Sequence, residues 1–460
     1  MIGAIPQYVG QEIMIEGWVA ARRDHGKIVF LDIRDRSAFV QTVVGAATES
    51  VKDARLESVV RIQGLVKKRP ANMIDQSAIN GAFEVEVKEL TLLNSAKEMA
   101  IPADGQGYDI KEEVRMEYRY IDLRRPRLQR NLEMRHKVSK CIRDYLDERG
   151  FWEVETPNLT RSTPEGARDY LVPSRLEPGK FYALPQSPQQ YKQLLMVSGV
   201  EKYFQIARCF RDEDTRGDRQ PEFTQLDLEM SFVEREDVMA LNEELLITLV
   251  KTLYPEKKIQ QIPFPRLSYA EAMAKYQSDR PDIREDKNDP DLLAFCWVID
   301  FPFFEKTSAG GWTFTHNPFS APLPEFASTL LSGSPSNEDI EKVIAAQYDV
   351  VLNGFEIGGG SIRTHSRSML ETIFSIMGYD KKTIETSFGH ILAALDSGAP
   401  PHGGIAWGLD RLLAILQNEP NIREVIAFPK TGDGRDLLMH APAPVDPKQL
   451  GELGLDLKKK

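Results

Sequence analysis

The residues best suited to chemistry are arginines and acidic side chains that fall in three separated segments of this 460-residue chain. The first segment runs from Phe210 to Asp227 and contains Arg211, Glu213 and Phe223. A charged turn between two strands would present a guanidinium that can bind a phosphate through two parallel hydrogen bonds. An aromatic side chain on the returning strand could stack on a base. A surface hairpin of mutually cancelling ion pairs is the alternative interpretation.

The second segment, Gly403–Leu412, combines glycines with Asp410 and Arg411 between apolar runs. The glycines allow a strand and a helix to pack closely. Arg411 would lie in the first turn of the helix, where the helix dipole favours anions. A single arginine at such a place is usually surface decoration, so this segment alone is weak support for a site.

The third segment, Asp349–Arg363, reads as a strand that ends in glycines. Its period of two places Asn353 and Phe355 on one face and Gly354 and Glu356 on the other. A carboxylate in an apolar strand is costly unless it is paired or bound to a cation, and Mg²⁺ prefers oxygen ligands. The arginine that closes the segment offers a fork that fits a carboxylate.

The elements that must position these segments form two groups. The first hundred residues read as short strands between turns, which suggests a small closed barrel of the oligonucleotide-binding type, with a sandwich as the alternative. The expected strands are Gln11–Ala20, Lys27–Ile33, Phe39–Val44, Ser58–Val66 and Ala82–Leu90, with a turn at Asp24–Gly26.

From Glu112 onward helical and strand patterns mix, which indicates an α+β domain. The expected strands are Tyr203–Cys209, Leu226–Phe232, Cys296–Phe301, Val350–Ile357 and Gly403–Trp407. The expected helices are Gln129–Arg149, Gln189–Val197, Arg235–Leu253, Glu338–Asp349, Ser366–Met377 and Leu409–Leu416. We therefore expect a barrel domain at 1–98, a linker at 99–112 and a second domain at 113–460, with an exposed connection at 278–291.

Composition narrows the class of protein. The net charge of −11 does not by itself indicate a nucleic-acid binder, although residues 111–145 carry 11 Lys/Arg against 6 Asp/Glu. No run of 18 apolar residues predicts a membrane helix, and the N-terminus does not resemble a signal peptide. The three cysteines are far apart, so we expect no disulfide framework, and a reducing cytoplasm fits.

Together these segments resemble the motifs of class II aminoacyl-tRNA synthetases. Phe151–Pro157 resembles motif 1, whose proline lies at the dimer interface, while Arg208–Glu229 resembles motif 2 and Gly403–Leu413 motif 3. Within this class, Ser162–Tyr170 resembles the mobile loop of the aspartyl-tRNA synthetases, and Gln186–Gln193 resembles their amino-acid site. The resemblance covers nearly the whole chain, and the barrel is similar to their anticodon-binding domain.

The resemblance implies a barrel of the oligonucleotide-binding type followed by a catalytic domain on an antiparallel sheet flanked by helices. It implies a homodimer that joins L-aspartate to tRNA-Asp through an aspartyl-adenylate, with ATP and Mg²⁺. Arg211 would contact the α-phosphate and Arg411 the γ-phosphate, Phe223 and Arg411 would enclose the adenine, and Glu213 would meet its amino group. Asp349 and Glu356 would hold Mg²⁺. The catalytic residues would be Arg211, Glu356 and Arg411.

The resemblance also implies the residues that bind the other substrates. Lys192 and Arg363 would bind the side chain of aspartate, with Asp227 orienting them. The aspartate-binding set is Glu165, Ser187, Gln189, Lys192, Asp227, His316 and Arg363. The anticodon-binding set is Arg22, Arg23, His25, Phe30 and Gln41.

Three departures from the family pattern stand out. Bacterial members usually carry an extra domain between motifs 2 and 3, where this chain has only residues 278–291. Asn317 stands after His316, where many members have a second histidine. His25 occupies a turn position associated with relaxed anticodon reading, which motivates the hypothesis that tRNA-Asn is charged as well as tRNA-Asp.

Three other functions remain open. A tRNA-independent amide-forming ligase could use the same core, but it has no use for an anticodon barrel. A non-catalytic nucleic-acid-binding relative should have lost at least one of Arg211, Glu356, Arg363 or Arg411, and all four are present. An asparagine-specific enzyme is the nearest alternative, and the Lys192/Arg363 pair disfavours it.

Overall fold

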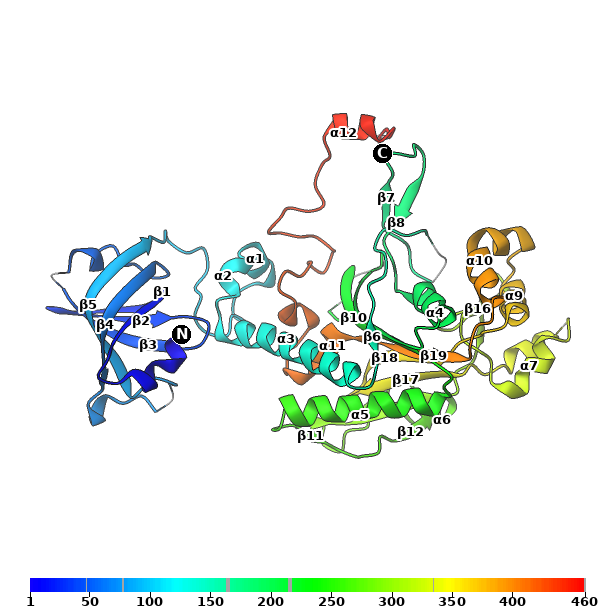
Figure 1. Cartoon of the computed structure of the whole chain (residues 1–460), viewed down its shortest axis with the longest axis horizontal. Coiled ribbons are helices and arrows are strands. Elements are labelled where there is room, and N and C mark those ends of the chain that lie inside the picture. The colour runs from blue at the N-terminus through cyan, green and yellow to red at the C-terminus, as the bar shows by residue number, and fades with distance from the viewer. Residues whose placement is uncertain (47, 77, 163–165, 214–216, 334, 459–460) are drawn as a thin grey trace. The chain divides into compact units, whose positions relative to one another are not determined.

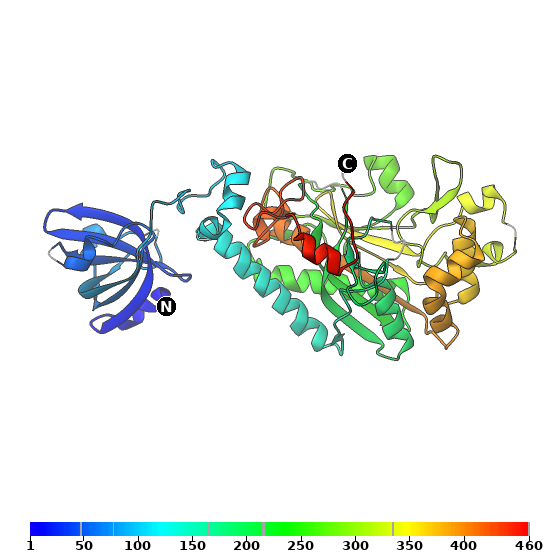
Figure 2. The same cartoon turned by 90° about the horizontal axis from the view of Figure 1, so that it is seen from above.

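The computed structural model describes residues 1–46, 48–76, 78–162, 166–213, 217–333 and 335–458. These residues form two compact units, Met1–Gln129 and Arg130–Lys460. Figures 1 and 2 show the elements of each unit in two views. No described helix combines the length and the apolar character needed to cross a membrane.

The first unit contains the predicted barrel, closed in the order β1-β2-β3-β5-β4. Its strands are β1 (Glu12–His25), β2 (Ile28–Arg34), β3 (Phe39–Gly45), β4 (Val59–Lys68) and β5 (Phe83–Asn94). Alternating apolar residues fill the interior, and short turns of 3-10 helix, η1 (Ile2–Tyr8), η2 (Glu49–Val51) and η3 (Ala71–Met73), connect or cover the strands. The predicted closed barrel is confirmed.

One turn of the barrel differs from the prediction. Strand β1 continues through His25, which pairs with Ile28, so Asp24 lies in a strand and the chain reverses at Gly26 with φ +64°. Pairing these residues with β2 satisfies backbone groups that a longer turn would leave to water. Arg23 also gains an ion pair with Asp32 across the strands, with 2.8 Å between Arg23 Nη1 and Asp32 Oδ2.

The basic stretch 111–145 covers α1 (Glu112–Glu117), α2 (Arg119–Asp122) and most of α3 (Pro126–Asp147). Part of it is a buried cluster of arginines around one carboxylate. Asp122 is fully buried and accepts hydrogen bonds from Arg119 Nη1 at 2.9 Å and from Arg125 Nε at 2.7 Å. Several of the arginines thus fix the chain after the barrel.

The second unit is built on an eight-stranded sheet in the order β12-β14-β17-β18-β19-β10-β9-β6. Its strands are β6 (Trp152–Glu153), β9 (Lys202–Phe210), β10 (Glu222–Ser231), β12 (Arg266–Ser268), β14 (Phe295–Ile299), β17 (Gln347–Leu352), β18 (Phe355–Ile362) and β19 (His402–Gly408). Neighbouring strands are antiparallel except β12 with β14 and β6 with β9. The prediction of an antiparallel sheet therefore holds for its central strands.

Helices and short hairpins surround this sheet. The helices are α4 (Gln189–Val197), α5 (Arg235–Leu253), α6 (Tyr269–Tyr276), α7 (Pro324–Leu330), α8 (Asn337–Glu341), α9 (Arg367–Ile376), α10 (Lys381–Leu395), α11 (Leu409–Leu416), η4 (Ile422–Val425) and α12 (Pro447–Glu452). The remaining strand pairs are β7 (Leu171–Pro173) with β8 (Phe181–Ala183), β11 (Lys258–Ile259) with β13 (Leu292–Leu293), and β15 (Phe304–Lys306) with β16 (Trp312–Phe314). The connection 278–291 contains no helix or strand.

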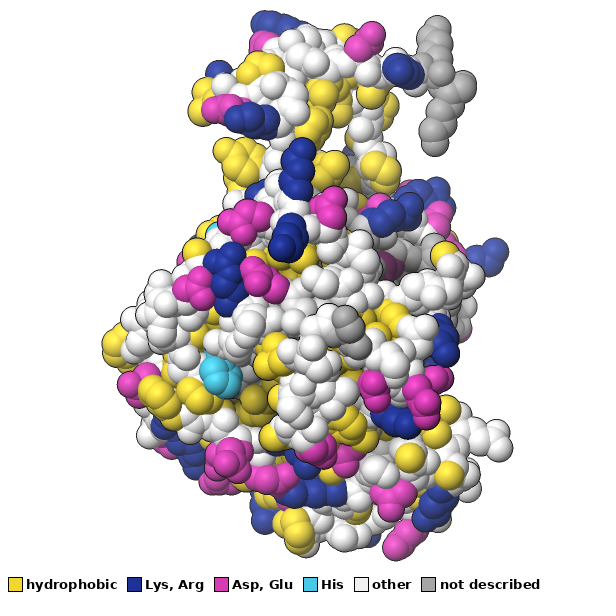
Figure 3. Space-filling view, turned by 90° about the vertical axis from the view of Figure 1, so that its right-hand side faces the viewer, with side chains coloured by type: hydrophobic (Ala, Val, Ile, Leu, Met, Phe, Trp, Pro, Cys, Tyr) yellow, Lys and Arg dark blue, Asp and Glu magenta, His cyan; other side chains and the backbone are white. Residues whose placement is uncertain are grey.

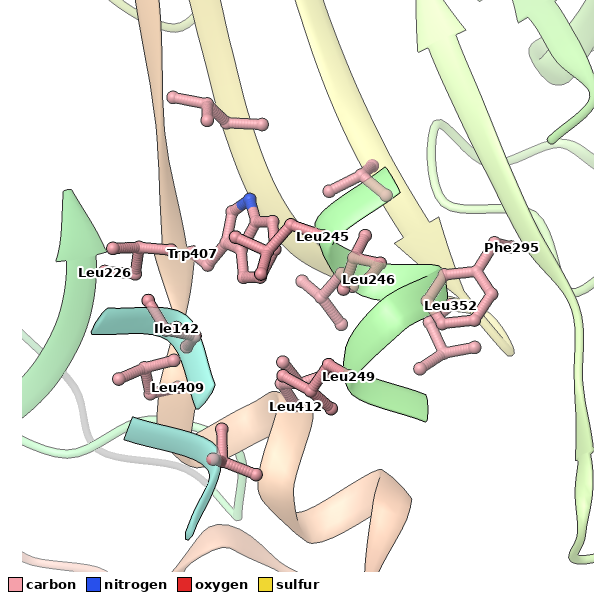
Figure 4. Packing of buried hydrophobic residues seen from close by; sticks show 14 of the residues in the cluster. Ile142, Leu226, Leu245, Leu246, Leu249, Phe295, Leu352, Trp407, Leu409 and Leu412 are labelled. Atoms are coloured by element: carbon pink, nitrogen blue, oxygen red, sulfur yellow. The ribbon is translucent and has the colours of Figure 1, made fainter. Parts of the chain in front are cut away.

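One face of the sheet is apolar and packs against helices, and the other is polar. Helices α3, α5 and α11 cover one face, where Leu226, Trp407, Leu245 and Leu412 belong to a single buried cluster. Figure 4 shows these side chains converging between the helices and the sheet. Because side chains alternate along a strand, the opposite face receives the polar residues of the same strands.

Two predictions for the middle of the chain were wrong. The strand predicted at Val350–Ile357 is a hairpin, because Asn353 and Gly354 turn the chain with φ values of +51° and +86°. Asn-Gly is a favoured pair for such a turn, which needs positive φ at both positions. The helix predicted at Glu338–Asp349 ends at Glu341, and its last residues belong to β17.

Candidate active site

Small residues form the floor of the polar face. The register across β10, β19 and β18 places Asp227 beside Ala406 and Gly359, and the row below places Glu229 beside Gly404. A Cβ on Gly404 would lie 2.1 Å from Glu229 Oε2, and one on Gly359 would lie 2.8 Å from Asp349 Oδ1. The missing side chains therefore leave room for the carboxylates on the neighbouring strands.

Two buried cations and two buried carboxylates lie on this floor. Lys192 Nζ, from α4, is 2.8 Å from Asp227 Oδ1 and 3.2 Å from Glu229 Oε2. Arg363 donates from Nε to Glu229 Oε1 at 2.9 Å and from Nη1 to the Ser361 hydroxyl at 2.7 Å. We call Lys192, Asp227, Glu229 and Arg363 the charge quartet, and each is at most 3% exposed.

The quartet corrects one predicted role. Asp227 contacts Lys192, but the carboxylate that orients Arg363 is Glu229. Sequence reasoning missed Glu229, although it lies two residues after Asp227 on the same strand and hence on the same face. The two-residue period of the strand could therefore have identified Glu229 from the sequence.

Burial and charge act in opposite directions on these two carboxylates. Burial raises the pKa of Asp227, and the Lys192 ammonium opposes that shift. Burial also acts to raise the pKa of Glu229, but the cations of Arg363 and Lys192 outweigh it and the pKa is lowered. The charges of the quartet balance, so a buried carboxylate brought by a ligand would meet two cations that are already held in place.

A cavity of about 250 Å³ opens above the quartet and is lined by Lys192, Asp227 and Arg363. The predicted Ser187, Gln189 and His316 also line it. Glu165 lies outside the described residues.

Hydrogen bonds hold the rim of this cavity. Gln189 accepts from Asn317 Nδ2 at 3.2 Å and donates from its amide to Gln193 Oε1 at 3.1 Å. His316 packs edge-on against Phe301, and burial lowers its pKa while the nearby Glu356 carboxylate opposes the shift. Asn317 therefore positions Gln189 by a direct hydrogen bond.

A second cavity of about 440 Å³ adjoins the first, and the two share Arg211, Gln225, His316, Glu356 and Ala406. The predicted Glu213, Phe223 and Arg411 line this second cavity. The structure thus brings the predicted phosphate-binding and amino-acid-binding residues into one continuous cleft.

Separate contacts position the two predicted phosphate-binding arginines. The Arg211 guanidinium carbon lies 5.1 Å from the centre of the Phe223 ring. Arg411 donates to the Glu356 carbonyl, while Nη2 lies 3.2 Å from Asp218 Oδ2. Arg411 follows Asp410, which is buried and joins α11 to its surroundings.

The buried carboxylate of Asp410 explains the charges between the apolar runs of α11. Its Oδ1 accepts from Arg135 Nη1 at 2.5 Å, and its Oδ2 accepts from the backbone amide of Thr224 at 3.0 Å. These bonds link α3, β10 and α11. They hold the beginning of α11, and with it Arg411, against the strand that carries Phe223.

Asp349 and Glu356 form a carboxylate pair suited to a divalent cation. Asp349 is buried and accepts from Gln347 Nε2 at 2.7 Å. Burial and the neighbouring Glu356 raise the pKa of Asp349 well above its ordinary value, and a bound cation would relieve both effects. Among the described residues no cluster of three His, Cys, Asp or Glu could hold a metal, so the remaining ligands would be water and phosphate oxygens.

In the barrel, the outward face of β1, β2 and β3 gathers four of the five predicted anticodon residues. Arg23 is paired with Phe30 across the strands and donates to Gln41 Oε1 at 3.3 Å. The rings of His25 and Phe30 meet edge-on with centroids 5.5 Å apart. Arg22 points elsewhere and donates to the Val51 carbonyl at 2.6 Å, so its contacts are structural.

Pro157 lies exposed after the edge strand β6. Trp152 and Leu159 flank it and are 65% and 54% exposed. Figure 3 shows one face of this unit, on which hydrophobic side chains gather near the base of the projecting β7–β8 hairpin. Leu171, Phe181 and Tyr182 of that hairpin are also exposed.

Comparisons with known proteins agree with both units. The family described as tRNA synthetases class II (D, K and N) matches residues 111–432, and the OB-fold nucleic acid binding domain matches residues 13–93. The aspartate–tRNA(Asp/Asn) ligase of Moorella thermoacetica is 40% identical over 97% of this chain and 94% of that protein. The aspartate–tRNA ligase of Listeria monocytogenes is 38% identical over 98% and 97%.

Solved structures show the same fold. Asparaginyl-tRNA synthetase from Pyrococcus horikoshii, complexed with asparaginyl-adenylate, has a TM-score of 0.74 at 25% identity and covers 93% of this chain and 96% of its own. Aspartyl tRNA synthetase from Entamoeba histolytica has a TM-score of 0.71 at 21% identity, covering 93% and 90%. The alignment with the Moorella protein spans 575 positions, so at least 115 of them (575 less 460) have no counterpart residue in this chain.

Proposed function

This chain belongs to the class II tRNA synthetases of the D, K and N group, and on that premise we propose that it is an aspartate–tRNA ligase. The charge quartet is the observation that carries the choice of amino acid. Lys192 and Arg363 line the smaller cavity with two buried cations, which suit the side-chain carboxylate of aspartate. A neutral amide in the same place would lack the charge through which a ligand carboxylate interacts with those two cations.

The proposed reaction has two steps. The α-carboxylate of aspartate attacks the α-phosphorus of ATP, and pyrophosphate leaves with the electrons of the broken P–O bond. The terminal hydroxyl of tRNA then attacks the adenylate carbonyl, and AMP leaves. Arg211 and Arg411 would neutralise phosphate charge, so catalysis is positioning plus electrostatic stabilisation, without a protein nucleophile.

We also propose that Asp349 and Glu356 hold Mg²⁺ in this cleft. The support is the raised pKa of Asp349 together with the oxygen-only donor set. When bound, the cation would add positive charge beside the phosphates. The chain's own contribution is to keep Glu356 on the wall shared by the two cavities and Asp349 on the lining of the smaller one.

Aspartate-dependent exchange between ATP and pyrophosphate tests the function directly. We expect exchange with aspartate and at least about 100-fold lower kcat/KM with asparagine, because discrimination by buried charged groups is steep. Exchange with asparagine alone would overturn the amino-acid assignment. Exchange with neither amino acid, by a folded protein supplied with Mg²⁺, would overturn the ligase itself.

We propose further that both tRNA-Asp and tRNA-Asn are charged. Two arguments support this, namely His25 on the outward face of the barrel and the Asp/Asn designation of relatives such as the Moorella protein. Purified tRNA-Asn should accept aspartate, and His25→Gln should change the ratio of the two charging rates. Lys27→Gln, in the adjoining turn, is the matched control and should leave the ratio unchanged. No aspartylation of tRNA-Asn at high enzyme concentration would refute this proposal.

A homodimer through Pro157 is the last part of the proposal. The exposed Trp152 and Leu159 beside an edge strand would be covered by the partner, which suits an apolar interface. Sedimentation should give twice the mass of the chain, and Trp152→Glu should shift the protein to monomer. A wild-type monomer at micromolar concentration would contradict it.

A further inference from the structure

Asp218 makes a contact for which the proposed reaction gives no role. Its Oδ2 lies 3.2 Å from Nη2 of Arg411, inside the larger cavity that both residues line. The other terminal nitrogen of Arg411 donates to the Glu356 carbonyl, while its Nε is buried without a hydrogen-bond partner. The carboxylate is therefore the only anion paired with Arg411 among the described residues.

The same segment supplies a second contact of this kind. Glu213 Oε2 lies 3.7 Å from Nη1 of Arg219, and both residues line the same cavity. Arg211 differs, because it faces the Phe223 ring and has no ion pair in the described part of the chain. Carboxylates therefore pair with Arg411 and Arg219, whereas Arg211 contacts the Phe223 ring.

A carboxylate and a terminal phosphate offer a guanidinium the same kind of oxygen acceptors. Both cannot occupy the same edge of Arg411 at once. The Asp218 side chain is 30% exposed, so it can turn toward water without leaving a buried charge behind.

We propose that Asp218 stands in for the terminal phosphate of ATP. It pairs with Arg411 and is displaced when the triphosphate binds. This inference rests on the proposed function, since it takes Arg411 to be the ligand of the terminal phosphate. It makes Asp218 a positioning residue that weakens the binding of ATP and of pyrophosphate but not of AMP, which lacks that phosphate.

Equilibrium binding to the whole protein, without aspartate, tests the idea. For Asp218→Asn we expect the dissociation constant of ATP to fall about two- to fivefold, the range that a partly exposed ion pair supports. Pyrophosphate should bind more tightly by a similar factor, and the dissociation constant of AMP should not change. The ratio of the ATP and AMP effects separates a specific contact from a general change of charge.

Asp212→Asn is the matched control, because it removes the same charge from the same part of the sequence, and Asp212 forms its ion pair among the described residues with Arg168 at 3.6 Å. It should leave the dissociation constant of ATP unchanged. The inference is overturned if Asp218→Asn binds ATP no more tightly than wild type, if AMP gains as much as ATP, or if Asp212→Asn gives the same gain. Failure of aspartate-dependent exchange by wild type would count against the proposed function and would leave these binding results standing.

Discussion

Replacing Lys192 by methionine should be among the most damaging single changes in the catalytic domain. The side chain keeps its approximate length but loses a charge that is 2.8 Å from Asp227 Oδ1 and 3.2 Å from Glu229 Oε2. Asp227 Oδ2 lacks a hydrogen-bond partner among the described residues, and the variant would also remove the ammonium that donates to Oδ1. Among the described residues of the quartet, Arg363 would remain as the one cation beside two buried carboxylates.

The geometry sets the size of the effect. At the 2.8 Å separation the pair attraction is about 6 kcal/mol for an effective dielectric constant of about 20. Part of it offsets the cost of burying both charges, and breaking one partner of a buried pair costs about 3–5 kcal/mol. We therefore expect Lys192→Met to lower the free energy of unfolding by about 3–5 kcal/mol.

Urea denaturation followed by circular dichroism measures this loss, and a second variant isolates its cause. Lys192→Met combined with Asp227→Asn removes the orphaned carboxylate and should recover at least about 2 kcal/mol of the loss. Activation of aspartate should stay at least about 100-fold below wild type in both variants, because the substrate carboxylate has lost one of its two cations.

The pH dependence of stability in Lys192→Met gives an independent check that the loss comes from the charge of Asp227. Without Lys192, burial raises the pKa of Asp227 further, so the protonated carboxyl is tolerated at low pH. The loss of unfolding free energy caused by Lys192→Met should therefore grow as pH rises above the ordinary carboxyl pKa. A loss under about 1 kcal/mol, or a double variant no more stable than the single one, would refute this account of the quartet.

Three further predictions follow from other parts of the structure. Gly359→Ala places a Cβ 2.8 Å from Asp349 Oδ1 and should raise the Mg²⁺ concentration for half-maximal exchange about tenfold, with unchanged thermal stability as the control. Asp349→Asn should stabilise the metal-free protein at neutral pH. The reason is that the wild type loses stability as pH rises from the ordinary carboxyl pKa to the raised pKa of Asp349. Thermal unfolding with and without Mg²⁺ should show a metal-dependent gain in melting temperature for the wild type and none for the variant. Phe30→Ala should raise the KM for tRNA about 5- to 100-fold through lost stacking, while exchange of ATP and pyrophosphate, which needs no tRNA, stays at the wild-type rate.

The elements that sequence predicts well are those with long and uninterrupted patterns. The helices Gln189–Val197, Arg235–Leu253 and Leu409–Leu416 have the predicted bounds, because apolar residues at helical spacing stop at clear end signals. The hairpin at Asn353-Gly354 was missed for the opposite reason. Apolar residues continue on both sides of the turn, so the sequence shows no break in the strand pattern, and the bulge after Val350 is not visible in it either.

Some residues of the site were likewise predictable from local sequence patterns, and others were not. Residues such as Arg211 and Arg411 were predictable because each lies in a segment with its own local pattern. The strand period could have placed Glu229 on the face of Asp227, but its pairing with Arg363 and that of Asp218 with Arg411 were not predictable, since each joins positions more than 100 residues apart. Such contacts depend on the register between strands and on the path of a loop, neither of which a local pattern determines.

The fold by itself does not select aspartate, because an asparaginyl-tRNA synthetase shares it with a TM-score of 0.74. The choice must therefore rest on side chains that change the charge of the smaller cavity while the backbone stays the same. Among the described residues that line it, Lys192 and Arg363 are the cations on its floor, while Arg211 lies on the wall shared with the larger cavity. Glu229 keeps Lys192 and Arg363 in place. Lys192→Met with Asp227→Asn replaces one cation and one carboxylate by neutral groups and should narrow the preference for aspartate over asparagine at least about tenfold in kcat/KM. An unchanged preference in a folded double variant would move the discrimination to another part of the cleft.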